Sequence, residues 1–235
     1  MDFTDTPEEA AFRVKARSFL AENAQPKAGG DRNLATGADK SGMLAASRPW
    51  QAKKAAAGFA GITMAKEYGG QGLSPIMEVI YRQEEAEFIA PRGVYEIGLG
   101  MCIPTMLAYA TEEQKQRYAG PALRGEEIWC QLFSEPAGGS DLAGLRTRAD
   151  RDGDGDDADW IINGQKIWTS GAQFSDYGIL VTRSDFDAPK HKGLTFFFLS
   201  MKSPGIEVRP IRQASGPANF NEVYFTDVRI PDSQR

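Results

Sequence analysis

The most informative stretch of this 235-residue chain is residues 129–143, which read WCQLFSEPAGGSDLA. An apolar run typical of a β-strand ends there at a small hydroxyl residue, Ser134, and a turn rich in Pro and Gly follows. Such a turn exposes backbone N–H groups, which suit the polar edge of a ring and a pyrophosphate. A second segment, residues 165–171, reads QKIWTSG and adds an aromatic face and hydroxyl groups. Together, the two segments predict a cradle for a flat cofactor ring.

Two interpretations of these segments remain open. In the first, the turn leaves the N–H groups of residues 137–139 free for a ligand, and three side chains share one side of an extended run: Gln131, Phe133 and Ser140. In the second, the segment is an ordinary Ser-Glu-Pro turn closed by Gly. Trp168 and Ser170 favour the first, because an indole packed on a flat ring adds about 0.5–1.5 kcal/mol beyond its buried area. Trp168 as part of a barrel core remains the alternative.

The charge of the chain argues against several classes of partner. With 27 Lys and Arg against 32 Asp and Glu, the net charge is -5, whereas a nucleic acid or an anionic membrane requires a basic stripe. The longest apolar stretches, such as residues 196–199, are too short to span a bilayer, and residues 1–5 lack the layout of a signal peptide. We therefore expect a cytoplasmic protein, and its length favours two domains.

Cysteine and histidine are scarce in this chain. Cys102 and Cys130 lie in apolar surroundings without the spacing of metal ligands, which predicts two buried, reduced thiols. The single histidine, His191, lies in a polar turn and is expected at the surface. A Ser/His/Asp triad or a histidine-based metal site is therefore not expected.

The first half of the chain has the pattern of helices. Thr6 begins a capping box, and apolar residues at helical spacing follow to about Asn23. Residues 24–41 are rich in small and polar residues and predict a loop. Ser74-Pro75 begins a helix running toward Ile89, for which we expect a buried face of four residues: Ile76, Val79, Ile80 and Phe88. A second capping box at Thr111 begins a further helix, with Pro121 near its end.

Near Ile128 the helical spacing gives way to short β-rich runs separated by turns, which predicts a helical domain at residues 1–127 and a β domain at 128–235. Within residues 160–168, Asn163-Gly164 predicts a hairpin turn between two strands. Further strands are expected at four runs: residues 177–182, 194–199, 206–208 and 223–230. The fold class is therefore α+β, an all-α domain followed by an antiparallel, barrel-like β domain.

Two other motifs favour ordinary loops. Residues 150–155 match the opening of a calcium-binding loop, but Ile161 stands where the bidentate Glu belongs, so an acidic hairpin loop is favoured. Residues 69–72 read GGQG, yet no Lys-Ser/Thr follows and no strand precedes them, so a phosphate-binding loop is not favoured.

Three stretches carry a resemblance to a known family. They are SEPAGGSDLA at 134–143, NGQKIW at 163–168 and FNEVYFTDVRIPD at 220–232. In order and spacing they resemble the acyl-CoA dehydrogenases, and the likeness runs nearly end to end. The resemblance implies the N-terminal helical and middle β domains of that family. The C-terminal helical domain that the family carries would begin where this sequence stops, at Arg235.

The resemblance also implies roles for individual residues around an FAD. Four residues would line the flavin, with the hydroxyl of the last bonding its pyrimidine edge: Gln131, Leu132, Phe133 and Ser134. Gly139 and Ser140 would meet the phosphates of the cofactor or the phosphate and pantetheine groups of CoA, so that Ser140 also binds substrate. Three residues would flank the isoalloxazine near its reactive nitrogen: Trp168, Thr169 and Ser170.

The activity implied by the resemblance is α,β-dehydrogenation of an acyl-CoA thioester, with electron-transfer flavoprotein as the electron acceptor and an oligomeric assembly. In the family a glutamate of the C-terminal domain removes the α proton, so no catalytic residue is expected on this chain, and neither Glu135 nor Glu222 is a candidate. We therefore expect weak FAD binding and little turnover from the chain alone. Two alternatives are a non-catalytic FAD- or CoA-binding partner subunit and a flavin oxidase or monooxygenase on the same scaffold.

Overall fold

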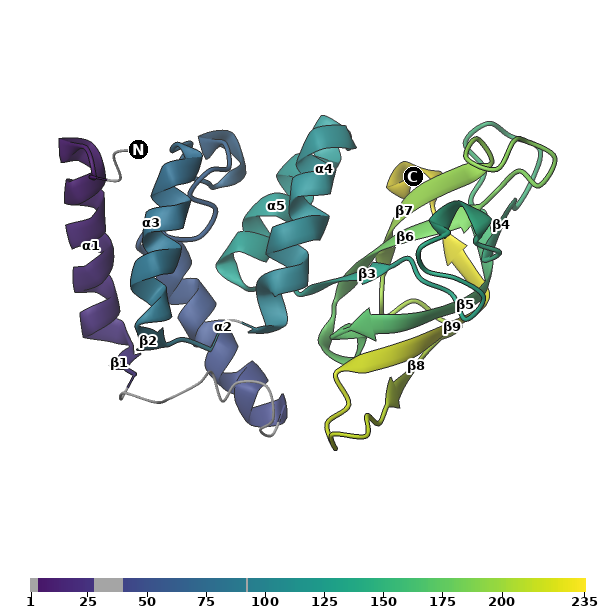
Figure 1. Ribbon diagram of the computed structural model, residues 1–235. Coiled ribbons are helices and arrows are strands. Elements are labelled where there is room, and N and C mark those ends of the chain that lie inside the picture. Colours follow the sequence, from purple (N-terminus) through teal and green to yellow (C-terminus); the bar gives the residue numbers. More distant parts are fainter. Residues whose placement is uncertain (1–3, 28–39, 92) are drawn as a thin grey trace. The chain divides into compact units, whose positions relative to one another are not determined.

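The computed structural model describes residues 4–27, 40–91 and 93–235 (Figure 1). It divides into two compact units, one formed by the chain up to Val94 with Ala110–Glu126, the other by Tyr95–Tyr109 with Glu127–Arg235. The predicted architecture, a helical part followed by a β part, is confirmed. Most of the loop expected at residues 24–41 lies outside the described residues.

The described residues of the first unit form four α-helices, α1 Pro7–Asn23, α2 Lys40–Ala56, α3 Pro75–Ala86 and α5 Glu112–Arg124. Both predicted capping boxes are present. At α1, the Glu9 N–H donates to Thr6 Oγ1 (3.3 Å) while the Thr6 N–H donates to the Glu9 carboxylate (2.7 Å), and Thr111 and Gln114 repeat this exchange at α5. In the described part of the chain, no helix is both long and apolar enough to cross a bilayer.

The expected buried face of α3 is confirmed for Ile80 and wrong for Ile76 and Val79, which are 45% and 46% exposed. The buried stripe follows the helical period through Ile80 and four residues that were not predicted: Met77, Tyr81, Glu84 and Glu85. Hydrophobicity alone misplaces this stripe because it contains two carboxylates. The helix also ends at Ala86, and the next residues, Phe88–Ile89 (β2), pair with Gln25–Pro26 (β1).

Ion pairs compensate the burial of the two carboxylates. Glu84 accepts hydrogen bonds from Arg17 (2.8 Å) and Arg13 (3.0 Å) of α1, which runs beside α3 (Figure 1). Glu85 pairs with Lys54 of α2 at 3.1 Å. The hydrogen bonds from Arg17, with those from Arg13, hold the pKa of Glu84 below its usual value. The register between α1 and α3 is therefore fixed by charge as well as by packing.

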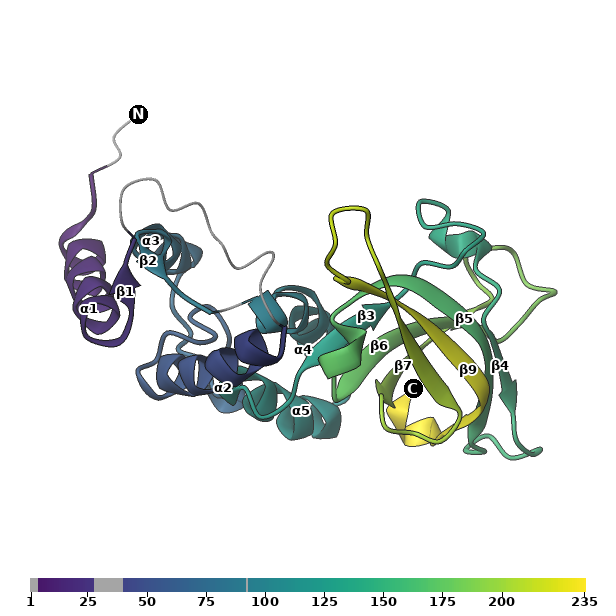
Figure 2. The same cartoon turned by 90° about the horizontal axis from the view of Figure 1, so that it is seen from below.

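The second unit is a curled sheet with seven strands: β3 Trp129–Leu132, β4 Arg148–Arg151, β5 Trp160–Ser170, β6 Tyr177–Arg183, β7 Leu194–Ser200, β8 Ile206–Ile211 and β9 Phe220–Ile230. The strand order is β3-β6-β4-β5-β9-β8, with β7 also paired to β6, and the strands curl around the core (Figure 2). The strands expected between residues 177 and 230 are confirmed. The sheet is mixed rather than purely antiparallel, because β3 pairs with β6 in parallel.

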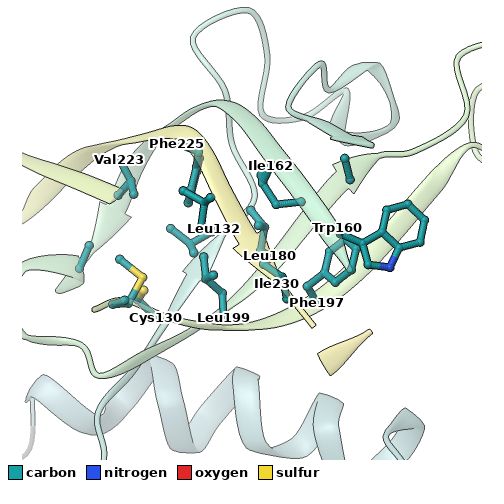
Figure 3. Close-up of a cluster of buried hydrophobic side chains, with 14 residues drawn as sticks. Cys130, Leu132, Trp160, Ile162, Leu180, Phe197, Leu199, Val223, Phe225 and Ile230 are labelled. Carbon is teal, nitrogen blue, oxygen red and sulfur yellow. The ribbon is translucent and has the colours of Figure 1, made fainter. Parts of the chain in front are cut away.

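The core of this unit lies on the inner face of the curled sheet. Figure 3 shows its side chains converging from β3, β5, β6, β7 and β9, among them Leu132, Ile162 and Leu180. A short helical stretch, η4 Gly98–Cys102 followed by α4 Ile103–Tyr109, belongs to the same unit, and the Cys102 thiol donates to the carbonyl of Cys130 (3.5 Å). Both cysteines are buried and free, as predicted, and burial raises the pKa of Cys130 to about 12.

The predicted hairpin turn at Asn163-Gly164 is wrong, because β5 runs unbroken from Trp160 to Ser170. The dipeptide forms a bulge against β9 instead. Asn163 exchanges two hydrogen bonds with Asp227, whose φ is 48°, and Gly164 is required because a Cβ there would lie 2.7 Å from Thr147 Oγ1. A close neighbouring segment, rather than a turn, explains this glycine.

We expect Glu84→Gln to destabilise the protein by about 1–3 kcal/mol at pH 7, because the neutral amide gives up the charge assistance in three hydrogen bonds from Arg13 and Arg17. The lowered pKa of Glu84 means that its contribution is complete above the unfolded-state pKa and is lost as the pH falls through the folded-state value. Urea unfolding at several pH values between neutral and acidic should therefore show the gap between wild type and variant closing in acid. A gap that stays constant with pH would contradict this assignment.

Candidate active site

The two segments predicted to form a cofactor cradle, residues 129–143 and 165–171, contact each other through Lys166 and Ile167. The Ile167 N–H donates to the carbonyl of Ser134 (2.9 Å), and the buried Lys166 ammonium donates to the carbonyl of Phe133 (3.1 Å) and to the carboxylate of Glu135 (2.8 Å). Residues 133–135 are thus each bound by the second segment. We call the Glu135–Lys166 pair the clamp.

The clamp also holds a third segment. One carboxylate oxygen of Glu135 accepts from the Thr147 N–H (2.8 Å) and the other from the Arg146 N–H (2.6 Å). Burial alone would raise the pKa of Glu135, but hydrogen bonds from Lys166 and Thr147 outweigh it and hold that pKa below its usual value. Burial lowers the pKa of Lys166, and its bond to Glu135 opposes the effect. A carboxylate engaged on both oxygens is poorly suited to act as a base.

A bulge makes the Ile167 N–H available to Ser134. In the β5–β9 register, Lys166 pairs with Val223 and Thr169 with Asn221, so that two residues of β5 lie opposite one residue of β9. The second of the two, Trp168, has a φ of 61°, which is unusual for a bulky side chain. The bulge therefore turns one amide toward the first segment and one indole away from the core.

The indole of Trp168 is 56% exposed, so the alternative in which it belongs to the barrel core is wrong. The other three tryptophans, Trp50, Trp129 and Trp160, are buried. Its one aromatic neighbour among the described rings is Phe220, met edge to face with centroids 6.1 Å apart. The flat face of an exposed indole is available to stack on a ligand ring.

The next residue, Thr169, and its cross-strand partner Asn221 each carry a buried polar atom without a hydrogen-bond partner in the described structure, Thr169 Oγ1 and Asn221 Oδ1. Leaving such an atom unpaired costs about 1–3 kcal/mol. A ligand with polar ring atoms would supply the missing partner, so the residues present fit a flavin. Sequence reasoning did not single out Asn221, although it falls on the inward side of the β9 alternation with Val223 and Phe225.

The Gly-rich turn lies next to the first segment. A Cβ on Gly139 would stand 3.2 Å from Ser134 Oγ, so the glycine keeps that hydroxyl approachable. The expectation that all amides of residues 137–139 are free is wrong for Gly138, whose N–H donates to the Glu135 carbonyl (3.0 Å) and closes the turn. In the described structure the amides of Ala137 and Gly139 donate to no other group, and Ser140 is exposed beyond them.

The remaining residues predicted to bind the cofactor differ in how deeply their side chains are buried. Leu132 is fully buried in the sheet core, so it could line a ligand with its backbone alone. Gln131, Phe133 and Ser170 are half-buried, and the Phe133 ring packs edge to face on Phe196. Ser140 does not share a strand face with Gln131, because β3 ends at Leu132.

The acidic loop and the histidine noted in the sequence form no metal site within the described residues. Three carbonyls of the β4–β5 loop, those of Gly155, Asp156 and Ala158, accept hydrogen bonds from the Arg151 guanidinium. Within the described residues no cluster of acidic, Cys or His side chains could hold a metal. His191 is exposed, as expected.

We expect Lys166→Met to destabilise the protein by about 3–5 kcal/mol, because it leaves the Glu135 carboxylate buried without a cation. Adding Glu135→Gln should recover part of this loss, since the two residues act on each other. The matched control is Lys190→Met, which breaks an exposed pair with Asp141 and should leave the stability nearly unchanged, because solvent screens an exposed pair. Urea unfolding measures all three, and equal losses for the two lysine variants would refute a structural role of the clamp.

Comparison with known proteins agrees with this geometry. Residues 6–126 match the family model "Acyl-CoA dehydrogenase, N-terminal domain" and residues 130–228 match "Acyl-CoA dehydrogenase, middle domain". The acyl-CoA dehydrogenase IpdE1 of Mycobacterium tuberculosis is 37% identical over 219 residues, which are 93% of this chain and 56% of that protein.

Two solved structures superpose on the whole chain with TM-scores of 0.79. One is titled "Tcur3481-Tcur3483 steroid ACAD" (30% identity, 58% of that chain covered), and the other is the ChsE4-ChsE5 complex from Mycobacterium tuberculosis (32% identity, 57% covered). The chain thus spans a little over half the length of these relatives. By its two family domains and the motifs that build its site, the chain belongs to the acyl-CoA dehydrogenase family.

Proposed function

We propose that this chain supplies the flavin-binding part of an FAD-dependent acyl-CoA dehydrogenase, which oxidises an acyl-CoA thioester between its α and β carbons. The observation that carries the proposal is the left-handed, exposed Trp168 next to the unpaired Thr169 hydroxyl, held beside Ser134 by the Ile167 hydrogen bond. The Trp168 indole would thereby provide a surface for ring stacking, and the adjacent Thr169 hydroxyl a polar contact to the same ring.

Each part of the site has a distinct task in this proposal. The Trp168 indole and the Thr169 hydroxyl contact the ring near its reactive nitrogen, with Ser170 beside them. The Ser134 hydroxyl and the backbone of residues 131–133 meet its pyrimidine edge, and the amides of Gly139 and Ser140 receive phosphate groups. FAD supplies the hydride-accepting chemistry when bound. This chain orients the ring and keeps water from one of its faces.

Proton abstraction is assigned to a group outside this site. Both oxygens of Glu135 are engaged by Lys166 and by backbone amides, and Glu222 accepts a hydrogen bond from Gln165 (3.2 Å). We infer that a carboxylate from another segment or subunit takes the α proton. Turnover by the chain alone should accordingly be low. We also expect weak FAD binding, because the chain spans a little over half the length of its relatives.

The substrate class and assembly are further parts of the proposal. The two structures with a TM-score of 0.79 are described in their titles as a steroid ACAD and as a two-protein complex. We infer a bulky, polycyclic acyl-CoA substrate and a partner chain that completes the site, with electron-transfer flavoprotein as the acceptor in the cytoplasm. The runner-up is a binding subunit that holds FAD or CoA without turnover.

An anaerobic titration separates these functions. FAD is added to the purified protein, alone and with its partner subunit, and then a steroid side-chain CoA thioester or a short straight-chain acyl-CoA. Bleaching of the flavin absorbance by the thioester supports a dehydrogenase, FAD binding without bleaching supports a binding subunit, and rapid peroxide release in air identifies an oxidase. No FAD binding in any combination would refute the proposal.

We expect Trp168→Ala to weaken FAD binding roughly tenfold, because stacking on the ring is lost. The matched control is Phe186→Ala, which removes another exposed aromatic side chain of the same unit, on the loop after β6. Isothermal titration with FAD provides the measurement. A loss of affinity that is equal in both variants would show that Trp168 does not form the ring seat.

A further inference from the structure

Asn221 is a polar side chain in a position that the sheet otherwise fills with apolar ones. It is 0% exposed and precedes Val223 and Phe225 on the inward face of β9, both of which pack into the core. A buried carboxamide is costly unless its hydrogen bonds are made. Its contacts therefore indicate why Asn stands here.

Both N–H groups of the Asn221 carboxamide are used. One donates to the carbonyl of Thr169 across the β5–β9 pair (2.9 Å), and the other donates to Gln173 Oε1 (2.5 Å) in the short helix η6 Ala172–Phe174. Gln173 in turn donates to the carbonyl of Ala218 (3.5 Å). A chain of hydrogen bonds thus runs from the end of β5 through β9 to the segment that leads into it.

These contacts fix one end of the bulge that presents Trp168. On the N-terminal side, the clamp residue Lys166 is held inside the unit; on the C-terminal side, Thr169 is held by Asn221. Between them, Trp168 occupies a left-handed backbone conformation that persists only where the surroundings enforce it. The two bulge residues, Ile167 and Trp168, are therefore restrained at one end by Lys166 and at the other by Asn221.

The use of both N–H groups also fixes the orientation of the carboxamide oxygen. Asn221 Oδ1 and the neighbouring Thr169 Oγ1 have no partner in the described structure. An Asn needed for packing alone would be satisfied on both of its polar atoms. A pair of unpaired polar atoms at the presented residue indicates instead a site arranged for a ligand.

We propose that Asn221 is a positioning residue of the ring seat: by holding Thr169 it keeps Trp168 in the left-handed conformation in which the indole and the Thr169 hydroxyl face the same ligand. The inference rests on the proposed function for the identity of that ligand. The bulge itself is a property of this chain, and it can be tested without any cofactor.

The test compares Asn221→Ala and Asn221→Asp with Asn163→Ala. The Asp variant keeps the volume of the side chain but cannot donate to the Thr169 carbonyl. Asn163 is the matched control because it supports the other bulge between β5 and β9, through Asp227. Gln173→Met is a milder variant that removes one acceptor of Asn221, should the others fold poorly.

Hydrogen–deuterium exchange of the protein without FAD is the first measurement. Loss of one or two hydrogen bonds should speed exchange in the peptide covering residues 166–172 by roughly tenfold in the Asn221 variants. The peptide covering β6 and the Asn163→Ala variant should show no such change at these amides. Iodide quenching of tryptophan fluorescence adds an independent signal, since Trp168 alone of the four tryptophans is exposed, and a Trp168→Phe protein identifies its share.

FAD titration is the second measurement, with affinity expected to fall about tenfold in the Asn221 variants and to stay unchanged in Asn163→Ala. Uniformly faster exchange across the sheet unit, or equal effects from Asn163→Ala, would overturn the positioning role and leave Asn221 a general stabiliser. Faster local exchange in a protein that binds no FAD in any assembly would support the positioning role and refute the proposed function instead.

Discussion

The buried ion pair between Glu135 and Lys166 is the interaction on which the site depends. It joins three segments that are distant in sequence, because Glu135 also receives the amides of Arg146 and Thr147, and Lys166 also reaches the Phe133 carbonyl. Charges taken out of water are stabilising together only when their geometry is complete. Here every one of these hydrogen bonds lies within 3.1 Å, so the three segments have one arrangement that satisfies them.

The long strands β5 and β9 use irregularity to build the site. Each of their two bulges places one non-glycine residue, Asp227 or Trp168, at positive φ and is supported by an asparagine on the opposite strand. A regular ladder would alternate these side chains strictly between core and solvent. The bulge at Trp168 breaks that alternation. It leaves the indole exposed two residues after Lys166, whose side chain is fully buried. The irregular pairing thus places an aromatic side chain at the surface of a strand whose neighbouring residues are buried.

The helical unit follows the same physical rule on a different scaffold. The buried stripe of α3 contains Glu84 and Glu85, and each is matched by a cation from a neighbouring helix. Apolar residues on the same helix, Ile76 and Val79, remain exposed. In both units, charge pairs therefore select which of several apolar packings is adopted, since an unmatched buried carboxylate would be far more costly than an exposed isoleucine.

Features that depend on neighbours along the chain could be predicted from the amino-acid sequence. Capping boxes at Thr6 and Thr111, the strands after Tyr177, the two unpaired thiols and the family motifs are all readable locally, because a cap or an alternating strand is made by residues within a few positions. The two segments that meet at the clamp were likewise recognisable from their composition.

The pairing of these segments depends on contacts between distant parts of the chain. Asn163-Gly164 forms a bulge because Thr147 lies against the glycine, β3 runs parallel to β6, and the Gly138 amide closes its own turn. Asn221 gains its role from Thr169, which lies 52 positions earlier in the chain. Hydrogen bonds and close contacts between distant segments set these features, and no local propensity encodes them.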